Sequence, residues 1–114
     1  MTRIYKLLPG SEWRAAQAAG RFEGSAIDVT DGYIHFSTAA QAQETGRKYF
    51  HGKADLMVLA VEGDSLGAAL KWEPSRGGDL FPHLYGALDV ASVVEASPVA
   101  LDAKGVPMLD DLAP

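Results

Sequence analysis

The stretch Asp31-Gly32-Tyr33-Ile34-His35-Phe36-Ser37-Thr38 places a turn, a short strand and a helix start one after another. Asp31-Gly32 is a turn signal, and the alternating side chains that follow it are typical of a half-buried strand. On such a strand Tyr33, His35 and Ser37 share one face. With Thr38, the pattern predicts that an imidazole and two hydroxyls converge where a helix begins.

Thr38 is predicted to begin a helix. With Gln41 it forms the T-x-x-Q pattern of a capping box, in which two backbone donors of the first helical turn are satisfied by side chains. A helix N-terminus attracts anions through its free N–H groups and its dipole. We therefore interpret His35, Ser37 and Thr38 as candidate ligand contacts, with a phosphate as one suitable ligand.

Composition excludes several classes of protein. The chain has 114 residues, 47% of them hydrophobic, which suits one globular domain with a core. Its formal charge of −5 argues against sequence-independent binding of nucleic acid. Without cysteine there is no disulfide framework and no thiolate metal site, and the chain needs no oxidising compartment.

The N-terminal residues do not resemble a signal peptide or a membrane span. Arg3, Lys6, Pro9 and Gly10 interrupt the first apolar run, so a continuous stretch of about 20 apolar residues is missing. We therefore expect neither secretion nor a membrane partner, and we expect a cytoplasmic location.

The order of patterns along the chain predicts a mixed α+β fold. Strands are expected at residues 3–8, 33–36, 55–61 at the sheet centre, 70–73, 90–96 and 99–101 after a bend at Pro98. Helices are expected over 11–19, capped by Ser11 and stopped by Gly20, and from 39 to about 50, stopped by Gly52. Residues 21–30 and 74–79 have no clear period and are expected to be loops, and Lys104-Gly105 is expected to turn the chain. The whole is predicted to be a single domain with a split, mostly antiparallel sheet and two main helices.

Residues 81–86, Phe-Pro-His-Leu-Tyr-Gly, form the second unusual stretch. Pro82 favours an extended conformation before it and removes one backbone donor, so we expect a strand start or an edge strand. His83 and Tyr85 then share a face, and we expect this stretch to be the companion wall of residues 31–38. Glu73 and Arg76 are further candidates, the first as a carboxylate directed at His35 and the second as a phosphate contact.

Each of these residues also has an ordinary structural role. A histidine within a sheet is commonly a hydrogen-bonded structural group, a charge in a glycine-rich loop is commonly solvated, and His51 beside a helix end favours the helix dipole. A zinc site of His35, His83 and Glu73 supporting metal-assisted hydrolysis is one alternative, although the spacing of known zinc motifs is missing. A non-catalytic module that binds a peptide or protein in an aromatic groove is the other.

A resemblance to a known family rests on motifs spread over nearly the whole chain. The motifs are Ile4-Tyr5-Lys6, Trp13, Gly20, residues 32–37, Gln41, Tyr49-Phe50, Trp72-Glu73 and residues 81–86. Together they resemble the small bacterial family called domain of unknown function 952. That family is itself distantly similar to the ADP-ribosyltransferase superfamily, which includes RNA 2′-phosphotransferases.

The resemblance implies an ADP-ribosyltransferase-like fold, with NAD or another phosphorylated nucleotide as ligand and as candidate substrate. It implies that Tyr5 and Tyr85 contact rings, that His35 and Ser37 position ribose or phosphate, and that His83 adds a polar contact. His35 and Glu73 are the implied catalytic pair, with Glu95 as a second candidate for the glutamate. The first strand reads Tyr5-Lys6-Leu7 where many relatives carry His-Gly-Thr.

Overall fold

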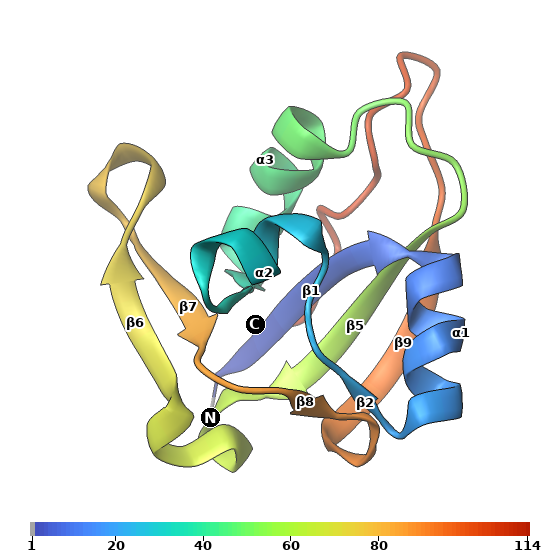
Figure 1. Ribbon diagram of the computed structural model, residues 1–114. Helices are drawn as coiled ribbons and strands as arrows, with labels where there is room; N and C mark the ends of the chain where they lie inside the picture. The colour runs from blue at the N-terminus through green and yellow to red at the C-terminus, as the bar shows by residue number, and fades with distance from the viewer. Residues whose placement is uncertain (1) are drawn as a thin grey trace.

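The computed structural model describes residues 2–114 and contains three antiparallel sheets (Figure 1). The largest has the order β4-β1-β5-β9, formed by Ser37–Thr38, Arg3–Pro9, Leu56–Glu62 and Val93–Val99. The second has the order β3-β7-β6, formed by Ile34–His35, Leu80–Leu84 and Leu70–Pro74. The third pairs β2 with β8, Arg21–Phe22 with Leu88–Asp89. The predicted split antiparallel sheet is confirmed.

Within residues 2–114, three α-helices and three short 3-10 segments connect the strands. The helices are α1 (Gly10–Ala19), α2 (Ala26–Asp31) and α3 (Ala39–Tyr49). The 3-10 segments are η1 (Gly63–Ala69), η2 (Arg76–Gly78) and η3 (Val90–Ser92). Within residues 2–114 no helix is both long enough and apolar enough to cross a membrane.

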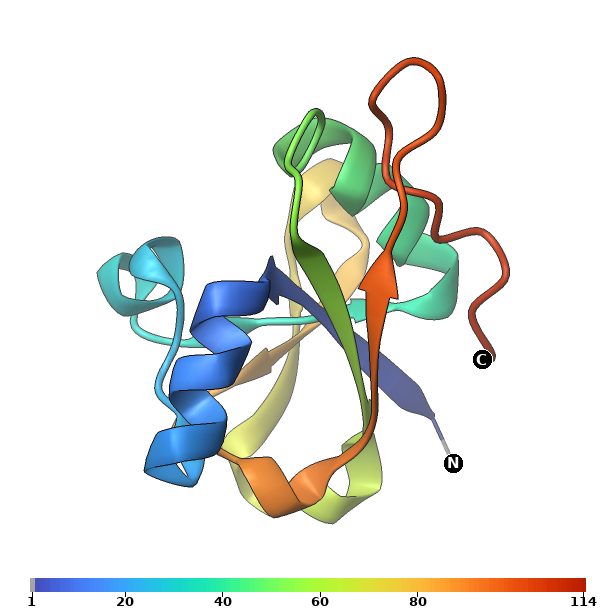
Figure 2. The ribbon, with the colours of Figure 1, turned by 90° about the vertical axis from the view of Figure 1, so that its right-hand side faces the viewer.

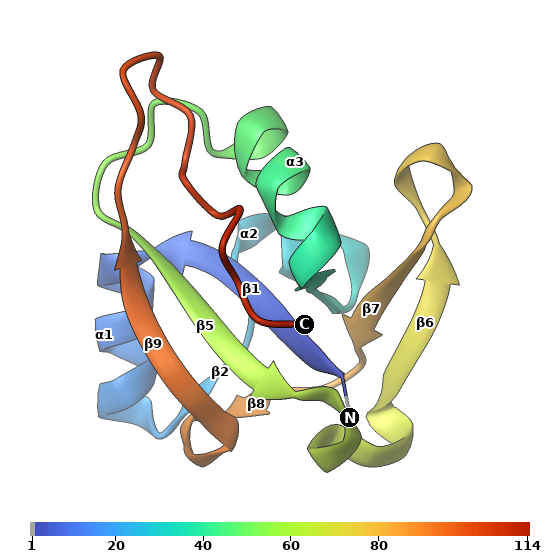
Figure 3. The same cartoon turned by 180° about the vertical axis from the view of Figure 1, so that it is seen from behind.

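The large sheet is covered on both faces, which explains the continuous apolar runs of β1 and β5. On one face lies α1 (Figure 2), and its Trp13 is buried in the same hydrophobic cluster as Ile4 and Leu59 of the sheet. On the other face α3 and the C-terminal segment cover the sheet, with Ala42 and Leu109 buried there (Figure 3). Strands buried on both faces need apolar residues at successive positions, and the prediction of a central strand at 55–61 is confirmed.

The predicted strand around His35 serves two different sheets. His35 belongs to β3 in the second sheet, Ser37 belongs to β4 in the large sheet, and only Phe36 lies between them. Phe36 is buried, and its N–H donates to the carbonyl of Pro82 at 3.0 Å. The chain therefore changes sheet at Phe36, so the face shared by His35 and Ser37 in a regular strand is lost here.

The prediction of a loop over residues 21–30 was wrong. These residues contain β2 and most of α2, whose N-cap Ser25 forms a capping box with Asp28. Gly32 ends α2 in the left-handed conformation with φ 88°, which explains the Asp31-Gly32 turn signal. A helix of six residues is too short to show a hydrophobic period, so its caps were the only signal.

Three boundary predictions also differ from the structure. β7 lies between β3 and β6, so it is not the edge strand that Pro82 suggested. Pro82 has no N–H to donate, but its carbonyl still accepts a hydrogen bond from the N–H of Phe36. β9 continues through Pro98 without a break, since β9 is itself at the edge of its sheet. α1 begins at Gly10 with Pro9 as its N-cap, one residue before the predicted cap at Ser11.

The capping box at the start of α3 is formed as predicted. The Thr38 hydroxyl accepts from the Gln41 N–H at 3.2 Å, and the Gln41 side chain accepts from the Thr38 N–H at 3.0 Å. We expect Thr38→Ala to lower the free energy of unfolding by about 1 kcal/mol, because a backbone donor of α3 loses its partner. Urea denaturation measures this loss. Thr30→Ala, at an exposed position of α2, is the matched control, and equal losses in the two variants would contradict the capping role.

Candidate functional site

Four aromatic rings meet on the outer face of the second sheet, and we call them the aromatic cluster: Tyr33, His35, His83 and Tyr85. His35 and His83 are paired across β3 and β7, with ring centroids 5.5 Å apart. Tyr33 stacks on His83 at 4.1 Å and lies 4.6 Å from His35 and 5.2 Å from Tyr85. The predicted proximity of residues 31–38 and 81–86 is confirmed by this pairing.

Glu73 on β6 fixes two members of the aromatic cluster. Its Oε1 lies 2.8 Å from the Nδ1 of His83 and accepts a 2.8 Å hydrogen bond from the hydroxyl of Tyr85. The hydrogen bond with His83, and after it that with Tyr85, holds the pKa of Glu73 below its usual value. The hydrogen bond between Tyr85 and Glu73 also raises the pKa of Tyr85. The cluster therefore carries an ionised carboxylate beside neutral tyrosines at neutral pH.

A buried ion pair lies behind His35. The ammonium of Lys6 on β1 lies 2.8 Å from Oδ2 of Asp28, and both side chains are almost completely buried. Oδ1 of Asp28 lies 2.6 Å from Nδ1 of His35 and also accepts from the backbone N–H of His35 at 3.1 Å. The side chains of Lys6, Asp28 and His35 thus form a continuous chain from the core to the cluster.

Lys6, Asp28 and His35 shift one another's charge equilibria, above all at Asp28. Burial raises the pKa of Asp28, but the hydrogen bond from His35 and the charge of Lys6 outweigh it, and the pKa falls to about 2. Burial lowers the pKa of Lys6, and the carboxylate of Asp28 opposes that shift. A further bond, 2.8 Å from the Ser25 N–H to Oδ2, holds the carboxylate in place. Asp28 is therefore an ionised carboxylate with a fixed orientation.

The other ring nitrogen of His35 points to the surface. Nε2 lies 2.9 Å from Oδ2 of Asp31, the last residue of α2. The side chains of His35 and Asp31 are 31% and 38% exposed, whereas that of Asp28 is 1% exposed. His35 consequently has one nitrogen bound inside the protein and one within reach of a ligand.

A hollow of about 400 Å³ lies beside the cluster, between α2 and the turn that follows β7. Tyr33 and Asp28 line it, together with Gly32, Gly86 and Ala87, which contribute little or no side chain. The hollow provides space for a ring next to Tyr33.

The predicted site residues fall into three places. His35, Glu73, His83 and Tyr85 lie together in and beside the aromatic cluster. Ser37 and Thr38 lie at the start of α3, and Arg76 contacts both this place, through Thr45, and Phe81 of β7. Tyr5 lies on the face of the large sheet that α3 and the C-terminal segment cover. Four of the predicted site residues therefore lie together at the aromatic cluster, and the others lie near the start of α3 or under the C-terminal segment.

The polar groups near the start of α3 are already engaged with one another. The buried hydroxyl of Ser37 lies 2.9 Å from that of Thr45, which also accepts from Arg76 at 3.3 Å. The guanidinium of Arg76 lies 4.9 Å from the ring centre of Phe81. Since Phe81 and His83 are on the same face of β7, Arg76 places a cation two strand positions from the cluster.

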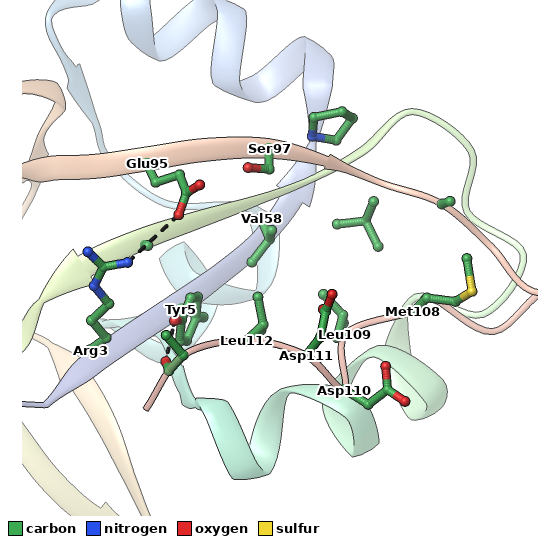
Figure 4. A pocket seen from close by; sticks show the side chains of 15 residues that line it. Arg3, Tyr5, Val58, Glu95, Ser97, Met108, Leu109, Asp110, Asp111 and Leu112 are labelled. Carbon is green, nitrogen blue, oxygen red and sulfur yellow. Dashed lines mark hydrogen bonds and ion pairs between the residues drawn. The ribbon is translucent and has the colours of Figure 1, made fainter.

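Tyr5 and Glu95 line a second cavity of about 570 Å³, beneath the C-terminal segment (Figure 4). The hydroxyl of Tyr5 donates to the carbonyl of Ala113, and Arg3 pairs with Glu95 at 3.7 Å. This cavity is larger than the hollow beside Tyr33, but no histidine lines it. We therefore place the candidate site at the aromatic cluster, where the titratable rings and their carboxylates are.

Sequence reasoning missed Lys6, Asp28, Asp31 and Tyr33 as site residues. Tyr33 was detectable, because it is two positions before His35 on the same strand face. Asp28 had a local signal in the Ser25-x-x-Asp28 capping box, but nothing in the sequence pairs it with Lys6, 22 positions earlier. That contact exists only through the packing of α2 over β1.

The predicted metal ligands do not converge on one point. Within residues 2–114 no group of three or more His, Asp or Glu side chains is arranged to hold a metal ion. Nδ1 of His83 is bonded to Glu73, and Nδ1 of His35 to Asp28, so these groups satisfy each other. The geometry does not support the metal-assisted alternative.

Asp28 is expected to make stability fall in acid. Its pKa is lowered from 3.8 to about 2, so its contribution is complete above about pH 4 and is lost as the pH falls towards 2. The shift corresponds to about 2 kcal/mol. Urea denaturation of wild type and Asp28→Asn between pH 5 and pH 2 measures it. The gap between the two proteins should narrow by that amount, and a constant gap would contradict the coupling.

Comparison with known proteins places this mixed α+β chain in a family. Residues 7–96 match the family model described as "Protein of unknown function (DUF952)", and the chain belongs to that family. No curated protein matches the sequence.

Solved structures of one relative share the fold. The crystal structure of protein CC0527 from Caulobacter crescentus has a TM-score of 0.95 and 57% identity, covering 96% of each chain. A crystal structure of its double mutant has a TM-score of 0.95 and 56% identity, again covering 96% of each chain. The solution structure of CC0527 has a TM-score of 0.88 and 58% identity, covering 97% of this chain and 96% of that one.

Proposed function

We propose that the aromatic cluster binds NAD or a related phosphorylated nucleotide, and that the chain is an ADP-ribosyltransferase-like protein of the cytoplasm. The single observation that carries the proposal is the convergence of four rings from β3, β7 and their flanking residues beside an open hollow. Stacking of a base or nicotinamide on an aromatic side chain contributes about 1–3 kcal/mol and needs no particular base. The cluster is suited to that kind of contact.

The polar groups around the rings suit the rest of such a ligand. Glu73 offers an ionised carboxylate to a hydroxyl, and Arg76 offers a guanidinium to a phosphate along the same face of β7. In this arrangement the ring lies against Tyr33 and the phosphates extend towards Arg76. The ligand contacts proposed from the sequence are thereby reduced to His35, Glu73, His83, Tyr85 and Arg76, joined by Tyr33.

His35 is the proposed acid or base if the nucleotide is turned over. Its Nδ1 is held by a buried, ionised carboxylate, and its Nε2 reaches the surface. Orientation of an imidazole by a carboxylate behind it is an arrangement that general bases use, because it fixes the tautomer and the direction of the reactive nitrogen. Glu73 is the second proposed catalytic group, polarising a hydroxyl of the ligand.

Isothermal titration calorimetry with NAD, ADP-ribose and ATP tests the proposal. We expect at least one of the three to bind wild type and to bind His35→Ala much more weakly. His51→Ala is the matched control, because His51 is exposed and, among the described residues, its side chain makes a single hydrogen bond, to the carbonyl of Lys104 at 2.7 Å. If wild type shows no heat with any of the three ligands, and none of them raises its melting temperature, nucleotide binding is refuted.

A second candidate function, peptide binding, is favoured by the free edge of β6. Among the described residues β6 pairs only with β7, and its Trp72 is 40% exposed. An extended peptide adds to such an edge through backbone hydrogen bonds. This function predicts that binding depends on Trp72 and persists in Glu73→Gln, whereas nucleotide binding should show the opposite dependence.

A further inference from the structure

The hydrogen bonds of His35 cannot both persist when the ring is neutral. Both nitrogens face carboxylates, 2.6 Å from Asp28 and 2.9 Å from Asp31, and an ionised carboxylate only accepts. A neutral imidazole has one N–H, so one contact must be lost. The contact kept is expected to be that with Asp28, because it is the shorter of the two and because the buried Asp28 carboxylate, unlike exposed Asp31, cannot replace a lost hydrogen bond with water.

The contact with Asp31 is the replaceable one. Asp31 is 38% exposed, and among the described residues its side chain has no other hydrogen bond or ion pair. When the ring is neutral with its proton on Nδ1, Nε2 presents a lone pair beside the exposed carboxylate of Asp31. Two acceptors next to each other at the surface are complementary to a ligand with two neighbouring hydroxyl donors.

The surrounding charges disfavour a phosphate at this position. The groups that face His35 are Asp28 and Asp31 from α2, Tyr33, and His83 from β7, with Glu73 of β6 behind His83. Lys6 neutralises Asp28, and Lys71, 5.5 Å from the ring centre of Tyr85, partly offsets the charge of Glu73. Among the described residues this leaves Asp31 as the carboxylate beside Nε2 that pairs with no lysine or arginine. An anion would be repelled there, whereas a hydroxyl would be bound.

We propose that Lys6 and Asp28 are positioning residues that hold His35 as an acceptor at Nε2, and that His35 and Asp31 together recognise a vicinal diol of a ribose. The proposal rests on the proposed function and assigns the ribose of the nucleotide, not its phosphate, to this point of the site. A carboxylate that accepts from ribose hydroxyls is a frequent means of recognition in nucleotide-binding proteins.

Nitrogen-15 NMR of the histidine rings in the full chain tests the positioning. The chain has only three histidines, so their ring signals are separable. Where His35 is neutral, wild type should carry its proton on Nδ1, and Asp28→Asn should shift the population towards protonated Nε2. His51 is the internal control. An unchanged tautomer in Asp28→Asn, or a neutral wild-type ring protonated on Nε2, would overturn the positioning role.

Simple probes test the diol separately from nucleotide binding. Methyl β-D-ribofuranoside should shift the His35 ring signals of wild type, and its 2-deoxy analogue and inorganic phosphate should not. Asp31→Ala should weaken the ribofuranoside effect by about tenfold, as expected for a hydrogen bond to a charged group. Asp64→Ala, which changes an exposed residue of η1, is the control and should leave the ribofuranoside effect unchanged. No effect of the ribofuranoside, or an effect of phosphate at His35, would overturn the proposal, while calorimetry with NAD would report independently on the proposed function.

Discussion

Replacing Asp28 by asparagine is expected to lower the free energy of unfolding by about 3–5 kcal/mol, which is the range for removing one partner of a buried ion pair. The cause is Lys6. Its ammonium is buried on β1, and its ion pair with Asp28 at 2.8 Å supplies its counter-charge. The amide of asparagine has no charge, so the buried ammonium would be left with only the weaker influence of Glu12. Urea denaturation at pH 7 measures the loss.

Asp31→Asn is the matched control for that variant. It removes the other carboxylate bonded to His35, but at an exposed position, where an ion pair contributes at most about 1 kcal/mol. The double variant Lys6→Met, Asp28→Asn separates charge from shape. If the pair is coupled as described, the double variant should lose less stability than the sum of its single variants. Equal effects of Asp28→Asn and Asp31→Asn, or simple additivity in the cycle, would contradict the buried pair.

The largest effect on ligand binding is expected for Tyr33→Ala. Tyr33 is within 5.2 Å of the other three rings of the cluster and lines the hollow beside them. Loss of one stacking contact weakens binding by about 1–3 kcal/mol, or roughly 5- to 150-fold. Calorimetry with ADP-ribose, or with whichever nucleotide of the three binds best, measures the change.

Two variants separate the ring of Tyr33 from its hydroxyl and from general effects. Tyr33→Phe keeps the ring and should keep most of the affinity. Tyr49→Ala removes an exposed tyrosine at the end of α3, outside the cluster, and should change nothing. If Tyr33→Ala binds as tightly as wild type, the rings do not form the ligand contact.

The fold could be predicted where local chemistry decides it. The box of Thr38 and Gln41, the left-handed Gly20 after α1 and the apolar run of β5 each carry their meaning within a few residues. α2 was missed because six residues show no period, and β7 was misplaced because Pro82 indicates an edge. For α2 there was no local period to detect, whereas for β7 the pairing with β3, far along the chain, overrides the local signal of Pro82.

The sequence allowed the rings and the carboxylate at the surface of the candidate site to be predicted, but not the buried ion pair behind them. His35, His83, Tyr85 and Glu73 stand out as polar or aromatic residues on strand faces, and pairing of β3 with β7 brings the two histidines together. Lys6 and Asp28 do not stand out, because one is within an apolar strand and the other within a region without a period. Their role depends on the packing of α2 over β1, which no local pattern encodes.

The position of the ligand is the central claim, and a nitrogen-15 HSQC titration of the full chain with ADP-ribose tests it most directly. The largest shifts are predicted at the amides of Tyr33, His35, His83 and Tyr85. The second cavity offers the competing location, with Tyr5 and Leu112 in its wall. Shifts centred on Tyr5 and Leu112, or no shifts with ADP-ribose at millimolar concentration, would contradict the account.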